Sequence, residues 1–455
     1  MRIHFIAIGG SAMHNLAIAL HKKGYRVTGS DDAIFEPSSS RLARHGLLPE
    51  EMGWDEANIT ADLDAVILGM HALTDNPELL KAQELGVKIY SYPEYIYEQT
   101  KDKLRVVIGG SHGKTTITSM ILHVLNFYER DFDYLVGAQL AGFDTMVKIT
   151  NEAPLIVIEG DEYLASPIDR RPKFHLYKAN LAVISGIAWD HINVFKTYAD
   201  YTRQFELFID TIEPGGKLIY CSADKDLEAI VKNSKADIEK IAYAIPAHVV
   251  KDGITYLLPD ETPLKVFGDH NLMNLNAAKS ICAELGIDSK QFDAAIGSFT
   301  GAAKRLELLL SEAETNVYKD FAHSPSKLKA TIEAVKAQFP NRKLVACIEL
   351  HTFSSLNKDF LVQYADTMSA ADIAIVYIDK KTFQHKKLDP FTKIDVQTAF
   401  NCPGLLFFDN SELLKEYLLK VNFYRSNLLL MSSGNFGGVD LVKLARELNI
   451  VEQGI

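Results

Sequence analysis

The chain has 455 residues, of which 47% are hydrophobic and 24% are charged, as in ordinary globular proteins. This length is too great for one compact core and predicts roughly two to four domains. The 48 Lys and Arg against 59 Asp and Glu give a net charge of -11, which provides no electrostatic footprint for nucleic acid, whose binding needs clustered cations. A small anionic ligand remains compatible, since a few backbone N–H groups and a local cation can bind phosphate.

Cysteine spacing and hydropathy place the chain in a reduced compartment. Cys221, Cys282, Cys347 and Cys402 are scattered without CxxC spacing and predict neither a disulfide framework nor a zinc site. No apolar run approaches the roughly 20 residues that span a bilayer, and no basic segment precedes an apolar run at the start. We therefore expect a cytoplasmic protein without membrane insertion.

The first hundred residues predict a small nucleotide-binding type of domain. An apolar strand at Ile3–Ile8 ends in Gly9-Gly10, and a helix follows from about Ala12 to Lys23. A second strand, Tyr25–Thr28, ends at Gly29-Ser30-Asp31. Two further strands complete the domain, at Ala65–Gly69 and Lys88–Tyr90.

Apolar runs continue to alternate with helical patterns, which is typical of parallel sheets covered by helices. A second block runs from 103 to 298 and a third from 299 to 455. The expected strands of the second block are Arg105–Ile108, Leu155–Ile158, Leu181–Ser185 and Lys217–Cys221. Those of the third are Val317–Phe321, Leu344–Ile348, Ile373–Tyr377 and Leu428–Met431.

The segment Gly110-Ser-His-Gly-Lys-Thr-Thr116 lies between a strand and a helix and predicts a phosphate-binding loop. Glycines let the backbone fold around phosphate oxygens, and the helix N-terminus directs N–H groups at the anion. Lys114 would reach the outer phosphates and the next hydroxyl would hold Mg²⁺. Ile108 stands where the general motif has glycine, so the loop is a shortened variant. A plain turn with a surface lysine is the alternative.

Acidic residues and a histidine follow two of the strands. Glu159, Asp161 and Glu162 come at the carboxyl end of Leu155–Ile158, where α/β proteins bind ligands, and are candidates for Mg²⁺. A solvated helix start is the alternative for this cluster. Asp190-His191 follows the strand Leu181–Ser185, and the histidine is either structural or a ligand of a second ion.

Taken in order, these segments resemble the Mur ligases of bacterial cell-wall synthesis. The likeness covers nearly the whole chain and rests on HFIAIGG, GSD, GSHGKTT, EGDE, DH, GDHNLMNLNAA, GAAKRLE and YKDFAH. It implies an α/β fold of three domains: an N-terminal Rossmann-like UDP-binding domain (1–102), a central P-loop ATPase domain (103–298) and a C-terminal Rossmann-like ligase domain (299–455). It also implies an ATP-dependent ligase that forms a C–N bond on UDP-N-acetylmuramate, with ATP and two Mg²⁺ ions.

The resemblance assigns roles to individual residues. Lys114, His191 and Arg305 are implied to be catalytic, and Thr115, Glu159 and His191 to hold Mg²⁺. ATP would be bound by Gly110, Ser111, His112, Gly113, Lys114, Thr115, Thr116, Asn271, Asn274, Arg305 and Asp320. The UDP substrate would be bound by Gly9, Gly10, Ser11, Ala12, Met13, Ser30 and Asp31. The acceptor would be bound by Arg171, Lys173, His323 and His351.

Some family positions differ in this chain. The family usually has Asn and Glu at the positions of Gly186 and Ala188, which precede Asp190-His191. A family pair of arginines is here Lys304-Arg305, and a family Asp-Asp-Tyr is here Lys319-Asp320-Phe321.

The acceptor is the open question within the family. The segments EGDEYLASPIDRRPKF, GSFTGAAKRLEL and MSSGNFGG resemble members that attach the tripeptide L-Ala-γ-D-Glu-meso-diaminopimelate, which we favour. The segment Glu349-Leu-His351-Thr-Phe-Ser354 instead resembles members that attach free L-alanine. Two remote alternatives are a nicotinamide-dependent dehydrogenase, for which Gly9-Gly10-Ser11-Ala12 is an incomplete fingerprint, and a non-catalytic P-loop switch.

Overall fold

The computed structural model of the chain describes residues 1–140, 142–189, 194–302, 305–312, 314–386 and 389–452. It divides into two compact units. The first unit is Met1–Ala244 with Asn274–Ile296, and the second is Ile245–Met273 with Gly297–Ile455. In the part of the chain so described, no helix combines the length and apolar character needed to cross a membrane. The expected domain limits at residues 102 and 298 stay a prediction.

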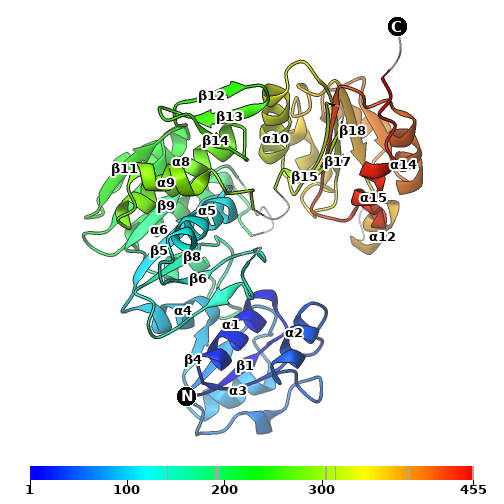
Figure 1. The fold of residues 1–455 in the computed structure, drawn as a ribbon. Coiled ribbons are helices and arrows are strands. Elements are labelled where there is room, and N and C mark those ends of the chain that lie inside the picture. Colours follow the sequence, from blue (N-terminus) through cyan, green and yellow to red (C-terminus); the bar gives the residue numbers. More distant parts are fainter. Residues whose placement is uncertain (141, 190–193, 303–304, 313, 387–388, 453–455) are drawn as a thin grey trace. The chain divides into compact units, whose positions relative to one another are not determined.

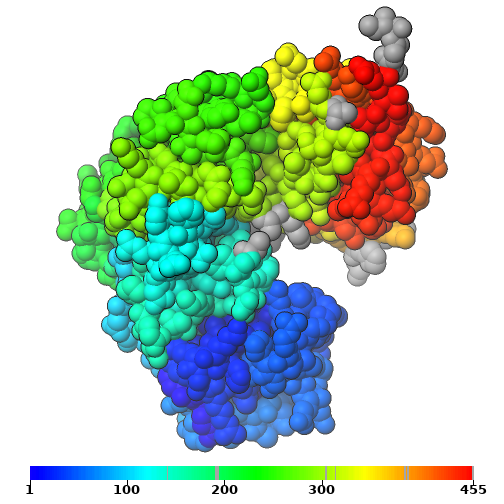
Figure 2. All heavy atoms as spheres, in the orientation of Figure 1, coloured from blue at the N-terminus to red at the C-terminus, as the bar shows by residue number. Residues whose placement is uncertain are grey.

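The first unit begins with a four-stranded parallel sheet in the order β2-β1-β3-β4. Its strands are β1 (Arg2–Ile6), β2 (Arg26–Ser30), β3 (Ala65–Leu68) and β4 (Ile89–Ser91), and its helices are α1 (Ser11–Lys22), α2 (Ser38–Arg44), η1 (Glu56–Asn58), α3 (Pro77–Glu84) and α4 (Tyr92–Thr100). The chain passes from β1 to β2 on one side and then to β3 on the other. Ligands of open α/β sheets bind at such a reversal, outside the carboxyl ends of the strands. The first hundred residues gather in one body (Figure 2).

The second sheet of this unit has seven strands in the order β11-β10-β9-β5-β8-β6-β7, and only β7 is antiparallel. The strands are β5 (Leu104–Gly109), β6 (Asp133–Leu135), β7 (Val147–Lys148), β8 (Leu155–Glu159), β9 (Leu181–Ile184), β10 (Lys217–Cys221) and β11 (Glu239–Tyr243). The helices of this part are α5 (Lys114–Phe127), η2 (Lys173–Leu176), α6 (Tyr198–Asp210), α7 (Lys225–Asn233), α8 (Asp269–Glu284) and α9 (Ser289–Ile296). Figure 1 labels α5, α6, α8 and α9 beside the sheet. The central strand β5 is apolar and buried, as a strand covered on both faces must be.

The second unit contains a small antiparallel sheet of β12 (His248–Lys251), β13 (Ile254–Leu257) and β14 (Thr262–Leu264). It is joined to the rest of the unit through Gln338, which lies on α10 (Pro325–Gln338). The Gln338 amide donates to Gly253 O at 2.6 Å, and its Oε1 accepts from Thr255 Oγ1 at 3.0 Å.

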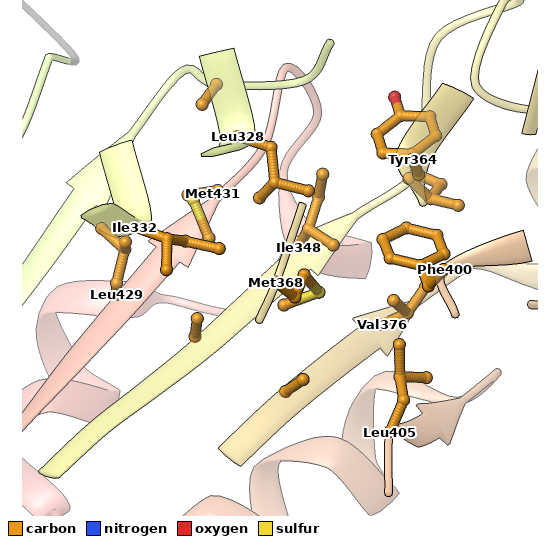
Figure 3. Packing of buried hydrophobic residues seen from close by; sticks show 14 of the residues in the cluster. Leu328, Ile332, Ile348, Tyr364, Met368, Val376, Phe400, Leu405, Leu429 and Met431 are labelled. Atoms are coloured by element: carbon orange, nitrogen blue, oxygen red, sulfur yellow. The ribbon is translucent and has the colours of Figure 1, made fainter. Parts of the chain in front are cut away.

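The main sheet of the second unit has the order β15-β16-β20-β17-β18-β19, and all strands except β15 are parallel. The strands are β15 (Glu307–Glu312), β16 (Thr315–Asp320), β17 (Lys343–Glu349), β18 (Ile373–Tyr377), β19 (Leu406–Phe408) and β20 (Ser426–Met431). The remaining helices are α11 (Lys358–Leu361), η3 (Val362–Tyr364), α12 (Lys380–Lys386), α13 (Lys393–Ala399), α14 (Ser411–Lys420), η4 (Phe436–Gly438) and α15 (Leu441–Glu447). On one face, Ile348 and Met431 of the sheet pack with Leu328 and Ile332 of α10 (Figure 3).

The expected α/β class with largely parallel sheets is confirmed. Each strand predicted from an apolar run is present, with ends that differ by a few residues. Strands β6, β7, β11 to β15 and β19 were not predicted.

A buried carboxylate links the strands and helices of the first sheet. Glu78 on α3 accepts from Asn58 Nδ2 at 2.9 Å and from Asp55 N at 3.1 Å, and its other oxygen accepts from the Ser30 hydroxyl. His4 Nε2 lies 3.3 Å from the same oxygen. Burial raises the pKa of Glu78, but the hydrogen bonds from His4, Asn58 and Ser30 outweigh it, so the pKa lies below its usual value.

This arrangement predicts an acid-sensitive contribution to stability. Because the pKa of Glu78 is lower in the folded chain, its stabilisation is present above the unfolded pKa and is lost as pH falls through the folded pKa. Glu78→Gln should therefore lower the free energy of unfolding by about 1–3 kcal/mol at neutral pH, and the difference from wild type should shrink in acid. Urea unfolding followed by circular dichroism, at neutral pH and in acid, measures the free energy of unfolding of both variants. Glu84→Gln, on the exposed side of α3, is the control and should change little; a pH-independent loss for Glu78→Gln would contradict the assignment.

Candidate active site

The predicted phosphate loop occupies the turn between β5 and α5. Gly110 has φ 127° and Gly113 has φ 77°, backbone conformations that favour glycine. A Cβ on Gly110 would lie 2.2 Å from Ser185 Oγ, and one on Gly113 would lie 2.2 Å from Asn274 Oδ1. The first turn of α5 has no side-chain cap, so its N–H groups are directed at the loop. The plain-turn alternative does not explain why the backbone is so closely packed here.

The turn after β9 braces this loop. Ser111 N and Ser111 Oγ both donate to Gly186 O, at 2.9 and 3.2 Å. Ser185 donates its hydroxyl to His112 O and its backbone N–H to Gly109 O. Gly186, one of the family departures, therefore shapes the loop through its carbonyl oxygen.

The Lys114 ammonium lies inside the loop and is largely buried. Its Nζ donates to Gly110 O at 2.5 Å and to Glu162 Oε2 at 2.7 Å. Burial alone would lower the pKa of Lys114, but the carboxylates of Glu162, Asp161 and Glu159 outweigh burial and raise it. The lysine is therefore a fixed positive charge at the helix start.

The three acids at the end of β8 and just after it have separate partners. The helix-start alternative for them is wrong, because Glu159 is the last residue of the strand and no helix follows it before η2. Glu159 accepts from Thr115 Oγ1 at 2.8 Å and from Gly137 N at 2.8 Å. Burial raises the pKa of Glu159 despite these bonds. Asp161 pairs with Lys173 at 2.7 Å and Glu162 pairs with Lys114.

Thr115 and Glu159 together fit the protein side of a Mg²⁺ site. A hydroxyl and a carboxylate oxygen 2.8 Å apart are hard ligands, and Mg²⁺ commonly takes one or two carboxylates and fills its shell with water and phosphate oxygens. The partly buried carboxylate of Glu159, whose pKa is raised, would be stabilised by a cation. The other predicted ligand, His191, lies outside the described residues, as does its neighbour Asp190.

The predicted UDP-binding residues follow β1 and β2. Gly9 N donates to Asp31 Oδ2 at 2.7 Å, and burial raises the pKa of Asp31. Gly10 precedes α1 and provides no side-chain cap, and Ser11, Ala12 and Met13 form the first turn of that helix. The Ser30 side chain is turned into the core toward Glu78, so its backbone carbonyl, which accepts from Ala7 N and Ile8 N, is what shapes this loop.

A segment from the second sheet contacts the same helix. The stretch between β6 and β7 begins next to Gly137, whose N–H binds Glu159. At its other end Met146 N donates to Asn15 Oδ1 on α1 at 2.9 Å. Sequence analysis did not identify Gly137, Asn15 or Met146, because each acts through a partner far along the chain.

The predicted cations Arg171 and Lys173 lie on a segment that folds back on the acids. Lys173 N donates to Tyr163 O at 2.9 Å. Arg171 makes a two-pronged ion pair with Asp169, with Nε–Oδ1 3.0 Å and Nη2–Oδ2 2.6 Å. This guanidinium is more than half exposed, whereas Lys173 is mostly covered and paired with Asp161.

The remaining predicted residues belong to the second unit, except Asn274, which lies against Gly113. Asp320, at the end of β16, accepts from Leu306 N and Ala322 N, both at 2.7 Å. Burial raises the pKa of Asp320, although Arg305 and these bonds oppose it. The Arg305 guanidinium lies over the Phe321 ring, 5.0 Å from its centroid, and His323 Nδ1 lies 2.8 Å from Phe321 O. Asn271 Nδ2 donates to Phe267 O at 2.9 Å.

His351 follows β17 and lies beside the loop after β20. A Cβ on Gly434 would be 2.9 Å from the His351 ring and 2.7 Å from Glu349 Oε2. Glu349, which is buried, accepts from Phe436 N at 2.8 Å and from the Ser432 hydroxyl. The HTFS and SSGNFGG segments, which favour different acceptors, therefore lie next to each other at the carboxyl ends of the neighbouring strands β17 and β20.

Comparison with known proteins shows similarity in sequence and in fold. A profile described as "Mur ligase family, catalytic domain" matches residues 2–103, and one described as "Mur ligase middle domain" matches 108–282. A UDP-N-acetylmuramate–L-alanine ligase of Caldicellulosiruptor bescii is 31% identical over 390 residues, covering 82% of each chain. A crystal structure of a murein peptide ligase from Psychrobacter arcticus has a similar fold, with TM-score 0.62, 22% identity and full coverage of both chains. A MurF ligase from Thermotoga maritima, in complex with ADP, has TM-score 0.60 and 15% identity, covering 85% of this chain and 87% of that one.

The close approach of Asn274 to Gly113 leads to a prediction. Gly113→Ala should weaken binding of a fluorescent ATP analogue by at least about tenfold, because the methyl group must displace Asn274 and the positive φ is strained. Gly215→Ala is the matched control, since Gly215 has φ 75° and no neighbour within 4 Å. It should lower the melting temperature through backbone strain and leave nucleotide affinity unchanged. Normal binding by Gly113→Ala would remove the loop from the nucleotide site.

Proposed function

The chain belongs to the Mur ligase family, and from this we propose that it joins the lactyl carboxylate of UDP-N-acetylmuramate to the amine of L-Ala-γ-D-Glu-meso-diaminopimelate. As a member of that family it is an ATP-dependent ligase that forms C–N bonds in peptidoglycan synthesis. This makes the dehydrogenase and the non-catalytic switch wrong. The observation that carries the chemistry is the loop itself, with Lys114 inside it and the Thr115–Glu159 pair beside it.

The reaction needs activation because a carboxylate is a poor electrophile. The lactyl carboxylate attacks the γ-phosphorus of ATP, so that an acyl phosphate forms and ADP leaves. The acceptor amine then attacks the acyl carbon, the C–O bond to phosphate breaks, and the amine loses a proton as phosphate departs. The protein contributes mainly position and charge stabilisation.

Several groups of the first unit serve this chemistry. The N–H groups at the start of α5 bind phosphate oxygens, and the Lys114 ammonium stabilises charge on the outer phosphates. Thr115 and Glu159 would hold one Mg²⁺ and His191 a second, and these ions would neutralise charge that develops during phosphoryl transfer. Asn274, which lies against the loop at Gly113, would contact the adenine side of ATP, together with Asn271 of the second unit.

Residues of the second unit would contact the phosphates and the ribose of ATP. Arg305 would bring its guanidinium to the phosphates. Asp320 would bind ribose hydroxyls, because each carboxylate oxygen retains a lone pair beside the backbone N–H that it already accepts. His323 and His351 would contact the acceptor from the ends of β16 and β17.

The UDP group would occupy the loop Gly9–Met13 at the strand-order reversal. The uncapped start of α1 suits the pyrophosphate. Asp31 holds the loop in shape through Gly9 N, and Ser30 contributes through its backbone.

The tripeptide is supported by cations near the predicted reaction centre. Its several carboxylates need partners, and Arg171 and Lys173 lie on a segment that folds onto the acids beside the loop. The second candidate, L-alanine, is favoured by the name of the relative from C. bescii and by His351-Thr-Phe-Ser354. Phosphate release with UDP-N-acetylmuramate, ATP and either acceptor decides between them.

We expect Lys114→Ala to lower ligation by at least about a hundredfold, the scale for losing one charge-stabilising donor. The change is measured as phosphate release at saturating substrates, with a thermal melt to show that the chain is folded. Turnover near the wild-type level would refute the assignment of the phosphate loop.

The acceptor assignment gives a separate prediction. Wild type should prefer the tripeptide by kcat/KM, and Arg171→Ala with Lys173→Ala should raise the KM for tripeptide by about tenfold or more while the Kd for UDP-N-acetylmuramate stays unchanged. Arg203→Ala with Lys225→Ala removes two exposed cations paired with Glu206 and Glu228 and should have no effect. A wild-type preference for free L-alanine would replace the tripeptide with the alternative acceptor.

A further inference from the structure

Glu162 is a buried carboxylate that the mechanism above does not use. Its side chain is fully covered, and each of its oxygens has a different partner. Oε2 accepts from Lys114 Nζ at 2.7 Å, and Oε1 accepts from the Tyr201 hydroxyl at 3.1 Å. A buried acid in a hydrogen-bonded chain of this kind fixes the direction of the groups it binds.

The geometry at Lys114 shows what is being fixed. A lysine ammonium has three N–H donors, and two of them are directed at Gly110 O and Glu162 Oε2. With two donors held, rotation about the terminal C–N bond is restricted and the direction of the third N–H is determined. Gly110 O belongs to the loop that surrounds the predicted phosphates, so the ammonium is held at the edge of that site.

Tyr201 is placed by packing. It lies on α6, is fully buried, and its ring contacts Phe205 at 5.2 Å and Phe195 at 5.5 Å between centroids. Aromatic neighbours on two sides leave the ring one orientation. The position of its hydroxyl is therefore set by the helix, and the Glu162 carboxylate is set by the hydroxyl.

We propose that Glu162 and Tyr201 are positioning residues, which hold the Lys114 ammonium so that its third donor meets the phosphates of bound ATP. The proposal rests on the proposed role of Lys114. A donor fixed before the reaction needs no reorganisation as charge develops, so the pair acts on phosphoryl transfer more than on binding of the ground state. Neither residue contacts the nucleotide.

Two other roles give different results. A purely structural ion pair would affect folding and leave turnover per folded molecule unchanged. A carboxylate that competes with phosphate for the lysine would, once neutralised, give tighter ATP binding with equal or faster turnover.

The main test is Glu162→Gln, which keeps the shape of the side chain and removes its charge. We expect kcat for phosphate release to fall by about tenfold to a hundredfold, the scale of a small misplacement at a reacting centre. The Kd of a non-hydrolysable ATP analogue, measured by calorimetry without Mg²⁺, should not weaken. Glu162→Asp should also lose kcat, since a side chain shorter by one methylene cannot reach both partners although it keeps the charge.

Tyr201→Phe tests the hydrogen bond from the Tyr201 hydroxyl to Glu162. It is also the variant to use if Glu162→Gln fails to fold. It should lower kcat in the same direction by a smaller factor, about threefold to tenfold, and the double variant should be no slower than Glu162→Gln alone because both act through one ammonium. Tyr198→Phe is the control, since it lies on the same helix and its hydroxyl donates to Asp226 at 2.7 Å; kcat should be unchanged.

A further control separates stability from positioning. Asp133 is as buried as Glu162 and pairs with Lys103 at 2.6 Å, away from the phosphate loop. Asp133→Asn should lower the melting temperature and leave kcat unchanged. The proposal is overturned if Glu162→Gln or Tyr201→Phe keeps kcat within twofold of wild type, or if kcat rises as ATP binds more tightly. Failure of the proposed function gives a different result, in which Lys114→Ala itself remains active.

Discussion

The candidate site depends on the register of three parallel strands. Ile108 of β5 pairs with Glu159 of β8, and Gly109 of β5 pairs with Ile184 of β9. The phosphate loop, the acids and the bracing turn therefore leave the sheet at the same level, although they are separated by up to 75 residues along the chain. Side chains alternate between the faces of a strand, so a slip of one residue would turn Glu159 away from Thr115. The apolar interior of the sheet, which specifies this register, thus also specifies the site.

The charges at this edge are arranged so that similar residues act differently. Asp161 and Glu162 are each paired with a lysine, whereas Glu159 accepts hydrogen bonds from the neutral Thr115 hydroxyl and Gly137 N–H. Burial raises the pKa of Glu159, which makes a divalent cation a favourable partner there. The direct environment, and not the residue type, separates the carboxylate proposed to hold Mg²⁺ from those that hold a lysine.

Prediction from sequence succeeded where a local pattern carries the information. The strand at Arg105–Ile108, the turn at Gly110–Gly113 and the helix after it are encoded in consecutive residues, and all are present. The acid cluster was ambiguous because its outcome depends on partners elsewhere: the Glu162–Lys114 pair spans 48 residues and Glu162–Tyr201 spans 39. The antiparallel strands β12 to β14 are short, and one of them contains Pro263, so no long apolar run predicts them. Ser30 was placed near the UDP site by its position after a strand, but a glutamate on α3 takes its hydroxyl.

The hydrogen bond from the Met146 amide to the Asn15 side chain connects the segment before β7 to helix α1 and can be followed by amide exchange. The Met146 amide proton is held by a side chain of α1, the helix that begins at the proposed pyrophosphate loop. The same stretch of chain starts at Gly137, beside the carboxylate proposed to hold Mg²⁺. Exchange of this one amide with solvent deuterium therefore reports on whether the segment between β6 and β7 stays docked on α1. A ligand bound at either end of that segment would change the exchange rate of this amide.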